Sequence, residues 1–260
     1  MSELHGTIVD IGDLGFSGYF VSPADGAAIK GGLVVIHEIW GLVDHIKDIA
    51  DRYAAEGYQV IAPDILSRGG VTPEVGEDLQ RLRESADEEE RTRFQPLLRE
   101  KMAPVNVPEY AEWAVSALKQ TVDALVLLPG VDGRVAVLGY CFGGSYSFAL
   151  AAADSRVKAA APYYGAPPQE TDYAGFACPV HAFYGRNDSR LIDALPEVEA
   201  KMRAAGVDFE ATVYENAGHA FFNDSNAHAY VPDAAADAWR QTLGFLDAAL
   251  GRAETAATPH

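Results

Sequence analysis

Cysteine, positive charge and long apolar runs are all scarce in this sequence. The chain has two cysteines, Cys141 and Cys178, which are too few for a disulfide framework. Its 20 lysines and arginines face 38 aspartates and glutamates, for a net charge of −18 at pH 7. This balance excludes nucleic acid and anionic membrane surfaces as partners, because both need basic patches.

The apolar segments and the start of the chain argue against a membrane span and a signal peptide. No apolar run approaches the ~18 residues of a membrane span. The start, MSELHGTIVD, lacks the basic and apolar regions of a signal peptide. We therefore expect a cytoplasmic protein whose thiols stay reduced.

What the sequence does contain is a regular alternation of short apolar segments and amphipathic segments. Strand character is found at 33–37, 58–65, 134–140, 156–165, 179–185 and 209–215. Helical periodicity is found at 43–57, 108–126, 142–153, 195–206 and 233–250. This alternation predicts an α/β fold with a mostly parallel central sheet and helices on both faces.

The two ends of the chain are predicted separately. TIVDI (7–11) and GYFVSP (18–23) are expected to form an antiparallel pair that leads into the sheet. Residues 251–260 are expected to form a flexible tail. The whole chain, 1–260, is predicted to be a single domain, which is a normal size for this class.

Residues 67–105 interrupt the alternation. The segment is charged, has helical character and lacks strand patterns. One interpretation is a surface helix whose acidic run, 87–90, faces water. The alternative is a cap or lid beside a functional site, because long excursions from compact folds often serve that purpose. The sequence leaves both interpretations open.

Cys141 lies in the segment LGYCFGG, between an apolar strand and a predicted helix. The spacing of Gly139, Cys141 and Gly143 matches the nucleophile elbow, a sharp turn in which side chains at the flanking positions would collide with backbone. Such a turn exposes the central side chain and points a helix N-terminus at it, which favours a thiolate. The alternative is a small buried structural cysteine.

The residues that follow Cys141 decide between these alternatives. An elbow needs an acid and then a histidine later in the chain. Asp188, in GRNDSRL, and His219, in ENAGHAFF, occur in that order, each just after a predicted strand. Open α/β sheets assemble sites at the carboxyl ends of their strands, so we expect the three side chains to meet. The sequence thus predicts a Cys–His–Asp catalytic triad.

The loop HEIWG, at 37–41, is predicted to complete this site. In elbow enzymes this loop supplies one backbone N–H of an oxyanion hole, and the residue after the nucleophile supplies the other. We therefore nominate the N–H groups of Ile39 and Phe142. Glu38 is unexpected, because a carboxylate opposes the negative charge of an oxyanion. It is either an ion-paired loop residue or a switch that meets Cys141 or an arginine.

Neither the other histidines nor the second cysteine indicates further chemistry. No histidine forms an H-x-H or H-E-x-x-H pattern, so no metal site is expected. Cys178 precedes Pro179 at the start of a predicted strand. We interpret it as a structural residue.

Together these segments resemble the dienelactone hydrolase family, a cysteine branch of the α/β-hydrolases. The resemblance covers about residues 16–250 and rests on HEIWGL, GYQVIAPDIL, LGYCFGGSYSF, YYGAP, GRNDSRL and YENAGHAFF. It implies an α/β-hydrolase fold and places the family's triad on Cys141, Asp188 and His219. It also implies that Glu38 ties up the resting site until substrate arrives and then helps to deprotonate the thiol.

The resemblance also implies a reaction. The lactone ring of a dienelactone is opened through an acyl-cysteine intermediate, without a cofactor. The implied partner is a small-molecule lactone or ester. Whether the chain acts as a monomer or a dimer is left open.

Asn223 departs from the family pattern. Dienelactone hydrolases bind the substrate carboxylate with two arginines, and the position four residues after the histidine is Asn223 here. This change removes a bidentate clamp. The candidates for the second arginine are Arg91 and Arg93, while Arg81 and Arg83 also occur in the segment.

The remaining substrate-binding candidates are aromatic. Trp40, Tyr164 and Phe222 lie beside the motifs and would either line an apolar acyl pocket or serve as core residues. Because of Asn223, a broader carboxylesterase or thioesterase on the same scaffold is an alternative to a dienelactone hydrolase. A non-catalytic fold used as a binding module is a third alternative, which the complete triad disfavours.

Overall fold

In the computed structural model, which describes residues 5–251, eight strands form one sheet in the order β1-β2-β4-β3-β5-β6-β7-β8. β1 pairs antiparallel with β2, and β2 with β4, whereas the other neighbouring pairs are parallel. The strands are β1 (Thr7–Ile11), β2 (Phe16–Val21), β3 (Gly31–Ile36), β4 (Tyr58–Pro63), β5 (Val135–Tyr140), β6 (Val157–Tyr163), β7 (Val180–Gly185) and β8 (Phe209–Tyr214).

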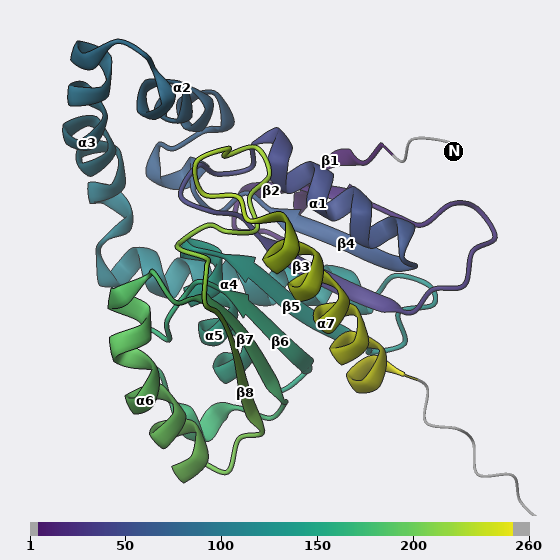
Figure 1. The fold of residues 1–260 in the computed structure, drawn as a ribbon. Helices are drawn as coiled ribbons and strands as arrows, with labels where there is room; N and C mark the ends of the chain where they lie inside the picture. The colour runs from purple at the N-terminus through teal and green to yellow at the C-terminus, as the bar shows by residue number, and fades with distance from the viewer. Residues whose placement is uncertain (1–4, 252–260) are drawn as a thin grey trace, which may run out of the picture.

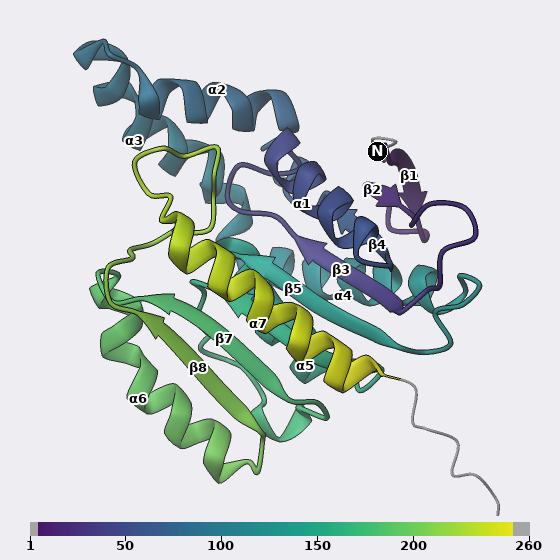
Figure 2. The same ribbon diagram turned by 45° about the vertical axis from the view of Figure 1, so that its right-hand side comes forward.

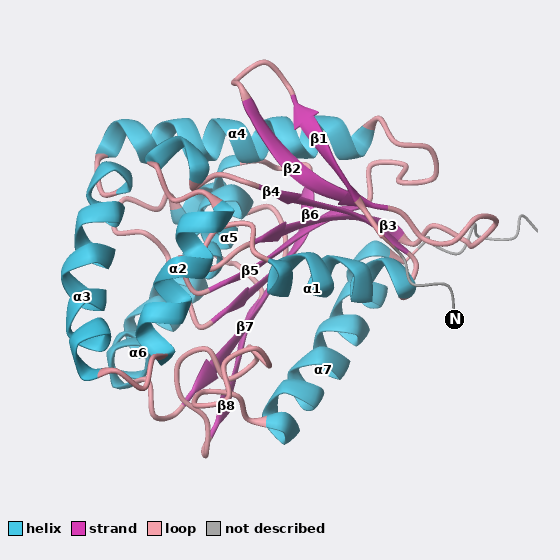
Figure 3. Cartoon of the chain, turned by 90° about the horizontal axis from the view of Figure 1, so that it is seen from above, coloured by secondary structure: helices cyan, strands magenta, loops and turns pink. Residues whose placement is uncertain are grey.

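Helices cover both faces of this sheet (Figure 3). One face carries α1 (Asp44–Ala55) and α7 (Pro232–Leu250), and the other carries α4 (Pro108–Val126), α5 (Phe142–Ala153) and α6 (Ser189–Ala204). Right-handed crossovers explain the faces of four of these helices, because the chain moves across the sheet in one direction through α1 and in the opposite direction through α4, α5 and α6. α7 follows the last strand and packs beside α1 on the remaining surface. The predicted α/β class with a mostly parallel sheet is confirmed.

Two further helices, α2 (Pro73–Glu84) and α3 (Glu88–Met102), stand apart from the sheet, beyond the carboxyl ends of its parallel strands (Figures 1 and 2). We call them the α2–α3 hairpin. Short 3-10 turns flank it at Ser67–Gly69 and Ala103–Val105, and a third lies at Tyr173–Gly175.

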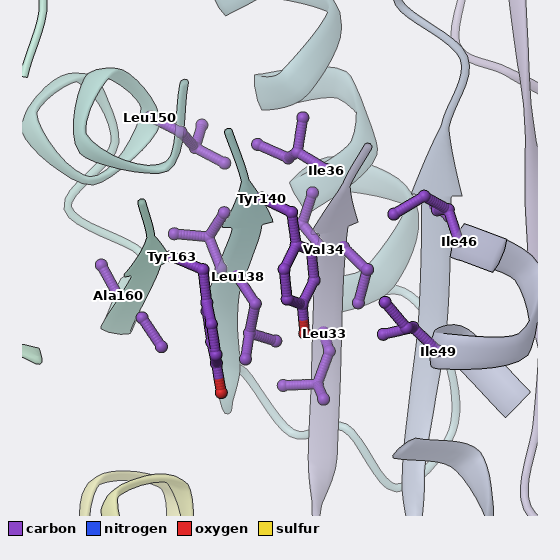
Figure 4. Packing of buried hydrophobic residues seen from close by; sticks show 14 of the residues in the cluster. Leu33, Val34, Ile36, Ile46, Ile49, Leu138, Tyr140, Leu150, Ala160 and Tyr163 are labelled. Atoms are coloured by element: carbon purple, nitrogen blue, oxygen red, sulfur yellow. The ribbon is translucent and has the colours of Figure 1, made fainter. Parts of the chain in front are cut away.

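The central strands are buried along their whole length. Every residue of β3 (GGLVVI) and of β5 (VAVLGY) is buried, as expected for parallel strands covered on both faces. Leu33 and Leu138 lie on the same face of the sheet as the rings of Tyr140 and Tyr163, whose centroids lie 4.7 Å apart (Figure 4). This rigid layer supports the strand ends where the candidate site lies.

The ends of the predicted segments agree with the structure to within two residues, except at the start of α6 and in the segment 67–105. The helix predicted at 195–206 begins at Ser189, because Leu191 and Leu195 are both buried and extend its apolar face by one turn. The single surface helix considered for 67–105 is two helices, since Ser85 leaves the helical conformation and Asp87 caps the next helix by accepting from Glu89 and Glu90. The second strand of the terminal pair begins at Phe16, before the predicted 18.

Two expectations concern the ends of the chain and its relation to membranes. The tail expected at 251–260 lies, beyond Gly251, outside the described residues. Between residues 5 and 251, no helix combines the length and apolar character needed to cross a membrane.

Candidate active site

Three polar side chains meet at the carboxyl edge of the sheet. Cys141 follows β5 directly, Asp188 follows β7, and His219 follows β8. His219 Nε2 lies 3.0 Å from Cys141 Sγ, and His219 Nδ1 lies 2.5 Å from Asp188 Oδ2. The structure therefore brings together the three residues that the sequence nominated as a triad.

The turn at Cys141 is strained in the way an elbow requires. Cys141 has φ 56° and ψ −109°, and its N–H donates to the carbonyl of Tyr163 at 3.0 Å. A Cβ on Gly139 would lie 2.0 Å from the Gly143 carbonyl oxygen, and one on Gly143 would lie 2.2 Å from that of Ile36. Only glycine fits these two positions, and the close packing holds Cys141 in its unusual conformation.

The loops after β7 and β8 are joined by backbone contacts that place the acid beside the histidine. The N–H of Asn187 donates to the carbonyl of Ala217 at 2.9 Å. A Cβ on Gly185 would lie 2.5 Å from the carbonyl oxygen of Gly218. This close approach leaves no room for side chains between the loops, so His219 stays within reach of Asp188.

Charge in the cluster favours a protonated imidazole. Burial lowers the pKa of His219, but hydrogen bonds and charge from Asp188 and Cys141 outweigh it and raise the pKa to about 10. Burial opposes ionisation of Asp188, yet the hydrogen bond from His219 and the charge of His219 hold its pKa below the ordinary value. The imidazole side chain is 39% exposed and the carboxylate 10%, so the histidine can reach solvent while its partner is shielded.

His37 fixes the loop 37–41 against the start of α5. Its Nδ1 lies 2.8 Å from the Glu38 carbonyl oxygen, and its Nε2 accepts from the Ile65 N–H at 3.3 Å. Burial lowers the pKa of His37, so we assign a neutral ring with its proton on Nδ1. The Gly143 N–H then donates to the His37 carbonyl at 3.1 Å, which ties the two segments together.

The two N–H groups nominated for an oxyanion hole lie on these joined segments. Phe142 occupies the first turn of α5, where an N–H has no intrahelical acceptor. Across the described residues, neither Phe142 nor Ile39 donates its N–H to a backbone carbonyl of a loop or turn. Both donors are thus available, and their role stays a prediction.

Glu38 is held by neutral donors. The carboxylate, 2% exposed, accepts from the Tyr164 hydroxyl at 3.2 Å and from Asn223 Nδ2 at 2.6 Å. No lysine, arginine or histidine within residues 5–251 forms an ion pair with it. In the structure the Cys141 thiol contacts His219, and the role that the resemblance implies for Glu38 stays a prediction.

The predicted substrate-binding residues Tyr164, Phe222 and Asn223 are all buried. The Tyr164 ring lies 5.2 Å from the imidazole of His219, between centroids. Phe222 stacks on Tyr140 at 5.4 Å, and the amide of Asn223 is occupied by Glu38. Tyr164 and Asn223 therefore hold Glu38 in place beneath the site, and Phe222 packs in the core.

Trp40 connects the site to the α2–α3 hairpin. Its ring lies 6.0 Å from that of Phe94 in α3, and the guanidinium of Arg83 in α2 lies 5.5 Å from its centroid. A Cβ on Gly76 would lie 1.8 Å from the Trp40 carbonyl oxygen. The hairpin thus packs directly on the residue after Ile39, and sequence spacing carried no signal for the Phe94 and Arg83 contacts.

The arginines of the hairpin face different surroundings. Arg91 donates to the carbonyls of Ser85 and Ala86, both at 2.7 Å, and Arg93 is exposed on α3. Arg81 pairs with Glu90 at 3.2 Å. Arg83 is the hairpin arginine whose cation lies over Trp40, so it is the one next to the loop 37–41.

The part of the chain that the structure describes holds no cluster of three or more His, Cys, Asp or Glu side chains able to bind a metal ion. Cys178 is buried, and burial raises its thiol pKa to about 12. That thiol stays protonated and unreactive near neutral pH.

Comparison with known proteins places these features in a family. The sequence pattern of the dienelactone hydrolase family matches residues 16–250. The chain belongs to the dienelactone hydrolase family. It is accordingly a hydrolase with a small-molecule substrate, and the resemblance read from its motifs is confirmed.

Individual proteins that are similar to this chain carry names consistent with this family. A Saccharolobus solfataricus protein with the provisional name carboxymethylenebutenolidase is 30% identical over 237 residues, covering 82% of this chain and 88% of that protein. A Synechocystis protein of the same provisional name is 30% identical over 236 residues, covering 84% and 86%. A crystal structure from Klebsiella pneumoniae, provisionally described as a dienelactone hydrolase, matches with a TM-score of 0.76 at 25% identity, covering 94% of this chain and 98% of that one. The fold is the α/β-hydrolase fold.

Proposed function

We propose that this family member hydrolyses a carboxylic ester or lactone through an acyl-cysteine intermediate. Cys141 is the nucleophile, His219 moves the proton, and Asp188 orients the imidazole. The observation that carries the proposal is the position of His219, with Nε2 3.0 Å from Cys141 Sγ and Nδ1 2.5 Å from Asp188 Oδ2. A nucleophile, a base and an orienting acid in this relation are the functional unit of triad hydrolases.

Acylation begins from a thiolate and a protonated His219. The raised pKa of His219 supports this starting state, because the imidazolium lies between two acidic groups. The sulfur attacks the carbonyl carbon, and the carbonyl electrons move onto oxygen to form a tetrahedral intermediate. The intermediate collapses, the C–O bond to the leaving oxygen breaks, and that oxygen takes the proton from His219 Nε2. A thioester on Cys141 remains.

Deacylation returns the enzyme to its starting state. Water gives a proton to His219 Nε2 and attacks the thioester carbon. The C–S bond breaks, the sulfur leaves as a thiolate, and the carboxylic acid is released. During both steps the oxyanion accepts from the N–H groups of Ile39 and Phe142, whose segments are joined through Gly143 and His37.

The favoured substrate class is a lactone or ester of the dienelactone type, as in the family. A second candidate is a broader carboxylesterase or thioesterase, and Asn223 is the observation that favours it. Its amide is engaged by Glu38, and Arg91 is engaged by backbone carbonyls. Neither of these two residues offers a free group to a substrate carboxylate, which supports a neutral substrate as the alternative.

One panel assay tests both candidates. The protein and its Cys141→Ala variant are assayed with a dienelactone, a neutral aryl ester and an acyl thioester, and the acyl adduct is sought on Cys141 by mass spectrometry. Loss of all turnover in the variant, with an adduct in the parent, is the expected result. Unchanged turnover in Cys141→Ala would contradict the mechanism, whereas absence of turnover of every substrate by the parent protein would favour a binding module. The ratio of kcat/KM for the dienelactone to kcat/KM for the aryl ester or the thioester shows which substrate class the protein prefers.

A further inference from the structure

Asn223 lies in the same loop as His219, and both its side-chain amide and its backbone groups form hydrogen bonds. Its Nδ2 donates to Glu38 Oε2 at 2.6 Å, and its Oδ1 accepts from the N–H and the hydroxyl of Ser225 at 3.1 and 2.6 Å. Its backbone N–H donates to Ala220, and its carbonyl accepts from Asn226. At 1% exposure, every polar group of Asn223 is paired, so its amide has a single orientation.

The bond from Asn223 to Glu38 joins the two halves of the site. Asn223 follows His219 in one loop, and Glu38 precedes Ile39 in the other. The partner on the second carboxylate oxygen, Tyr164, directly follows β6. Because both donors to the buried carboxylate are neutral, the directions of the two hydrogen bonds set its position, and no opposite charge contributes. We expect these bonds to fix the separation between His219 and the Ile39 N–H.

The next residue, Asp224, ties the same loop to α1. Its Oδ2 accepts from Arg52 Nη2 at 2.5 Å, and its Oδ1 lies 3.3 Å from Nδ1 of the buried His45. Arg52 also forms an ion pair with Asp48, one turn earlier on α1. These ion pairs attach the loop to α1, a helix that packs on the sheet. The attachment restricts the position of Asn223 relative to Glu38.

We propose that a group of four residues fixes the position of the His219 loop relative to the Ile39 loop. We call this group the loop lock; it consists of Glu38, Asn223, Asp224 and Arg52. Asn223 and Asp224 are positioning residues, since they contact neither the thiol nor the imidazole. Glu38 acts in the lock as a hydrogen-bond acceptor, so its negative charge is dispensable. The inference rests on the proposed function and deepens it.

An exchange of the hydrogen-bonding pair tests the lock. Asn223→Asp places two carboxylates against each other and breaks the bond; at pH 8 we expect kcat to fall about 100-fold while KM stays nearly constant. Glu38→Gln keeps an acceptor for Asn223, and we expect kcat within about fivefold of the parent. In the double variant, Glu38→Gln with Asn223→Asp, the new amide donates to the new carboxylate, and kcat is expected to recover to within about fivefold.

Rescue is the outcome that a general structural role would not produce. A double variant as slow as Asn223→Asp, or a Glu38→Gln variant slowed about 100-fold, would overturn the lock and make the charge of Glu38 essential. Urea unfolding of each variant identifies any that lose the fold. In that case Asn223→Ser, which removes the amide without adding a charge, replaces Asn223→Asp and is expected to slow kcat with KM nearly constant.

A matched pair on Arg52 tests the anchor. Asp224→Asn and Asp48→Asn each remove one carboxylate from the same guanidinium, but only Asp224 belongs to the loop. We expect kcat to fall about tenfold in Asp224→Asn and to stay within about twofold in Asp48→Asn. Equal effects of the two variants would overturn the anchor.

Failure of the lock is distinguishable from failure of the proposed function. If Cys141→Ala abolishes turnover while Asn223→Asp leaves kcat unchanged, the acyl-cysteine mechanism stands and the lock is wrong. If Cys141→Ala leaves turnover unchanged, the mechanism itself is wrong.

Discussion

His219 Nε2 lies 3.0 Å from Cys141 Sγ, although the two residues are 78 positions apart. The other ring nitrogen meets Asp188, so each nitrogen of the imidazole has one acidic partner. This arrangement fixes the rotation of the ring and favours its protonated form, and four expectations follow from it and from the surroundings of the site.

The first expectation concerns the two cysteines. Cys141→Ser keeps the size of the side chain but replaces sulfur with the less nucleophilic oxygen of a hydroxyl, and we expect kcat/KM for an aryl ester to fall by about 10³-fold or more. Cys178→Ala is the matched control, because this buried thiol precedes strand β7, whereas Cys141 follows the carboxyl end of the parallel strand β5. We expect its kcat/KM to stay within about twofold. A large loss in the control alone would contradict the assignment of Cys141 as nucleophile.

The second expectation concerns pH. The folded-state pKa of His219, about 10, exceeds its unfolded value of about 6.5, so protonation of His219 stabilises the folded state. That contribution is complete below about pH 6.5 and is lost as the pH rises to about 10. The difference in unfolding free energy between the parent and His219→Ala should therefore shrink from about pH 6 to about pH 10. Urea denaturation at both pH values measures it, and a constant difference would exclude the ion-paired state.

The third expectation concerns the elbow glycines. Gly143→Ala would put a Cβ 2.2 Å from the Ile36 carbonyl oxygen, and we expect the unfolding free energy to fall by about 1–3 kcal/mol. Gly244→Ala is the control, because a Cβ there meets nothing within 4 Å on α7. It should raise the unfolding free energy by about 0.5–1 kcal/mol. Chemical denaturation of both variants gives the comparison, and a neutral Gly143→Ala would disprove the tight turn.

The fourth expectation concerns substrate charge. Arg83 lies over Trp40, next to the loop 37–41, whereas Arg91 is occupied by the carbonyls of Ser85 and Ala86. Arg83→Gln should raise KM about tenfold for a lactone that bears a carboxylate and leave KM for a neutral aryl ester unchanged. Arg91→Gln should change neither value. Equal effects of the two variants on the charged lactone would contradict a role for Arg83.

Much of the fold could be predicted because its signals are local. Fully buried strands such as β3 and β5 are continuous apolar runs, and the helix at 108–126 matches α4 residue for residue. The start of α6 was harder to predict. The proline at position 196, inside α6, imitates a first turn, whereas burial of Leu191 begins the helix at Ser189.

The residues nominated for the triad came from rules that do not depend on distance along the chain. Glycines at 139 and 143 are required by sterics at the turn, and the order Cys141, Asp188, His219 follows from the topology of the sheet. Parallel strands bring their carboxyl ends to one edge, so side chains just after different strands meet there. The sequence could therefore predict that these three residues converge.

The surroundings of Cys141, Asp188 and His219 were decided by tertiary structure alone. Glu38 bonds to Asn223 across 185 positions, and Trp40 meets Arg83 and Phe94 from a separate hairpin. Such contacts depend on where side chains point after the chain has reversed several times, and no local pattern records that direction. The sequence by itself determined the strands, the tight turn at Cys141 and the order of the three nominated residues, because each follows from backbone sterics, sheet topology and periodic burial. Only the packed structure decided that Asn223 faces Glu38.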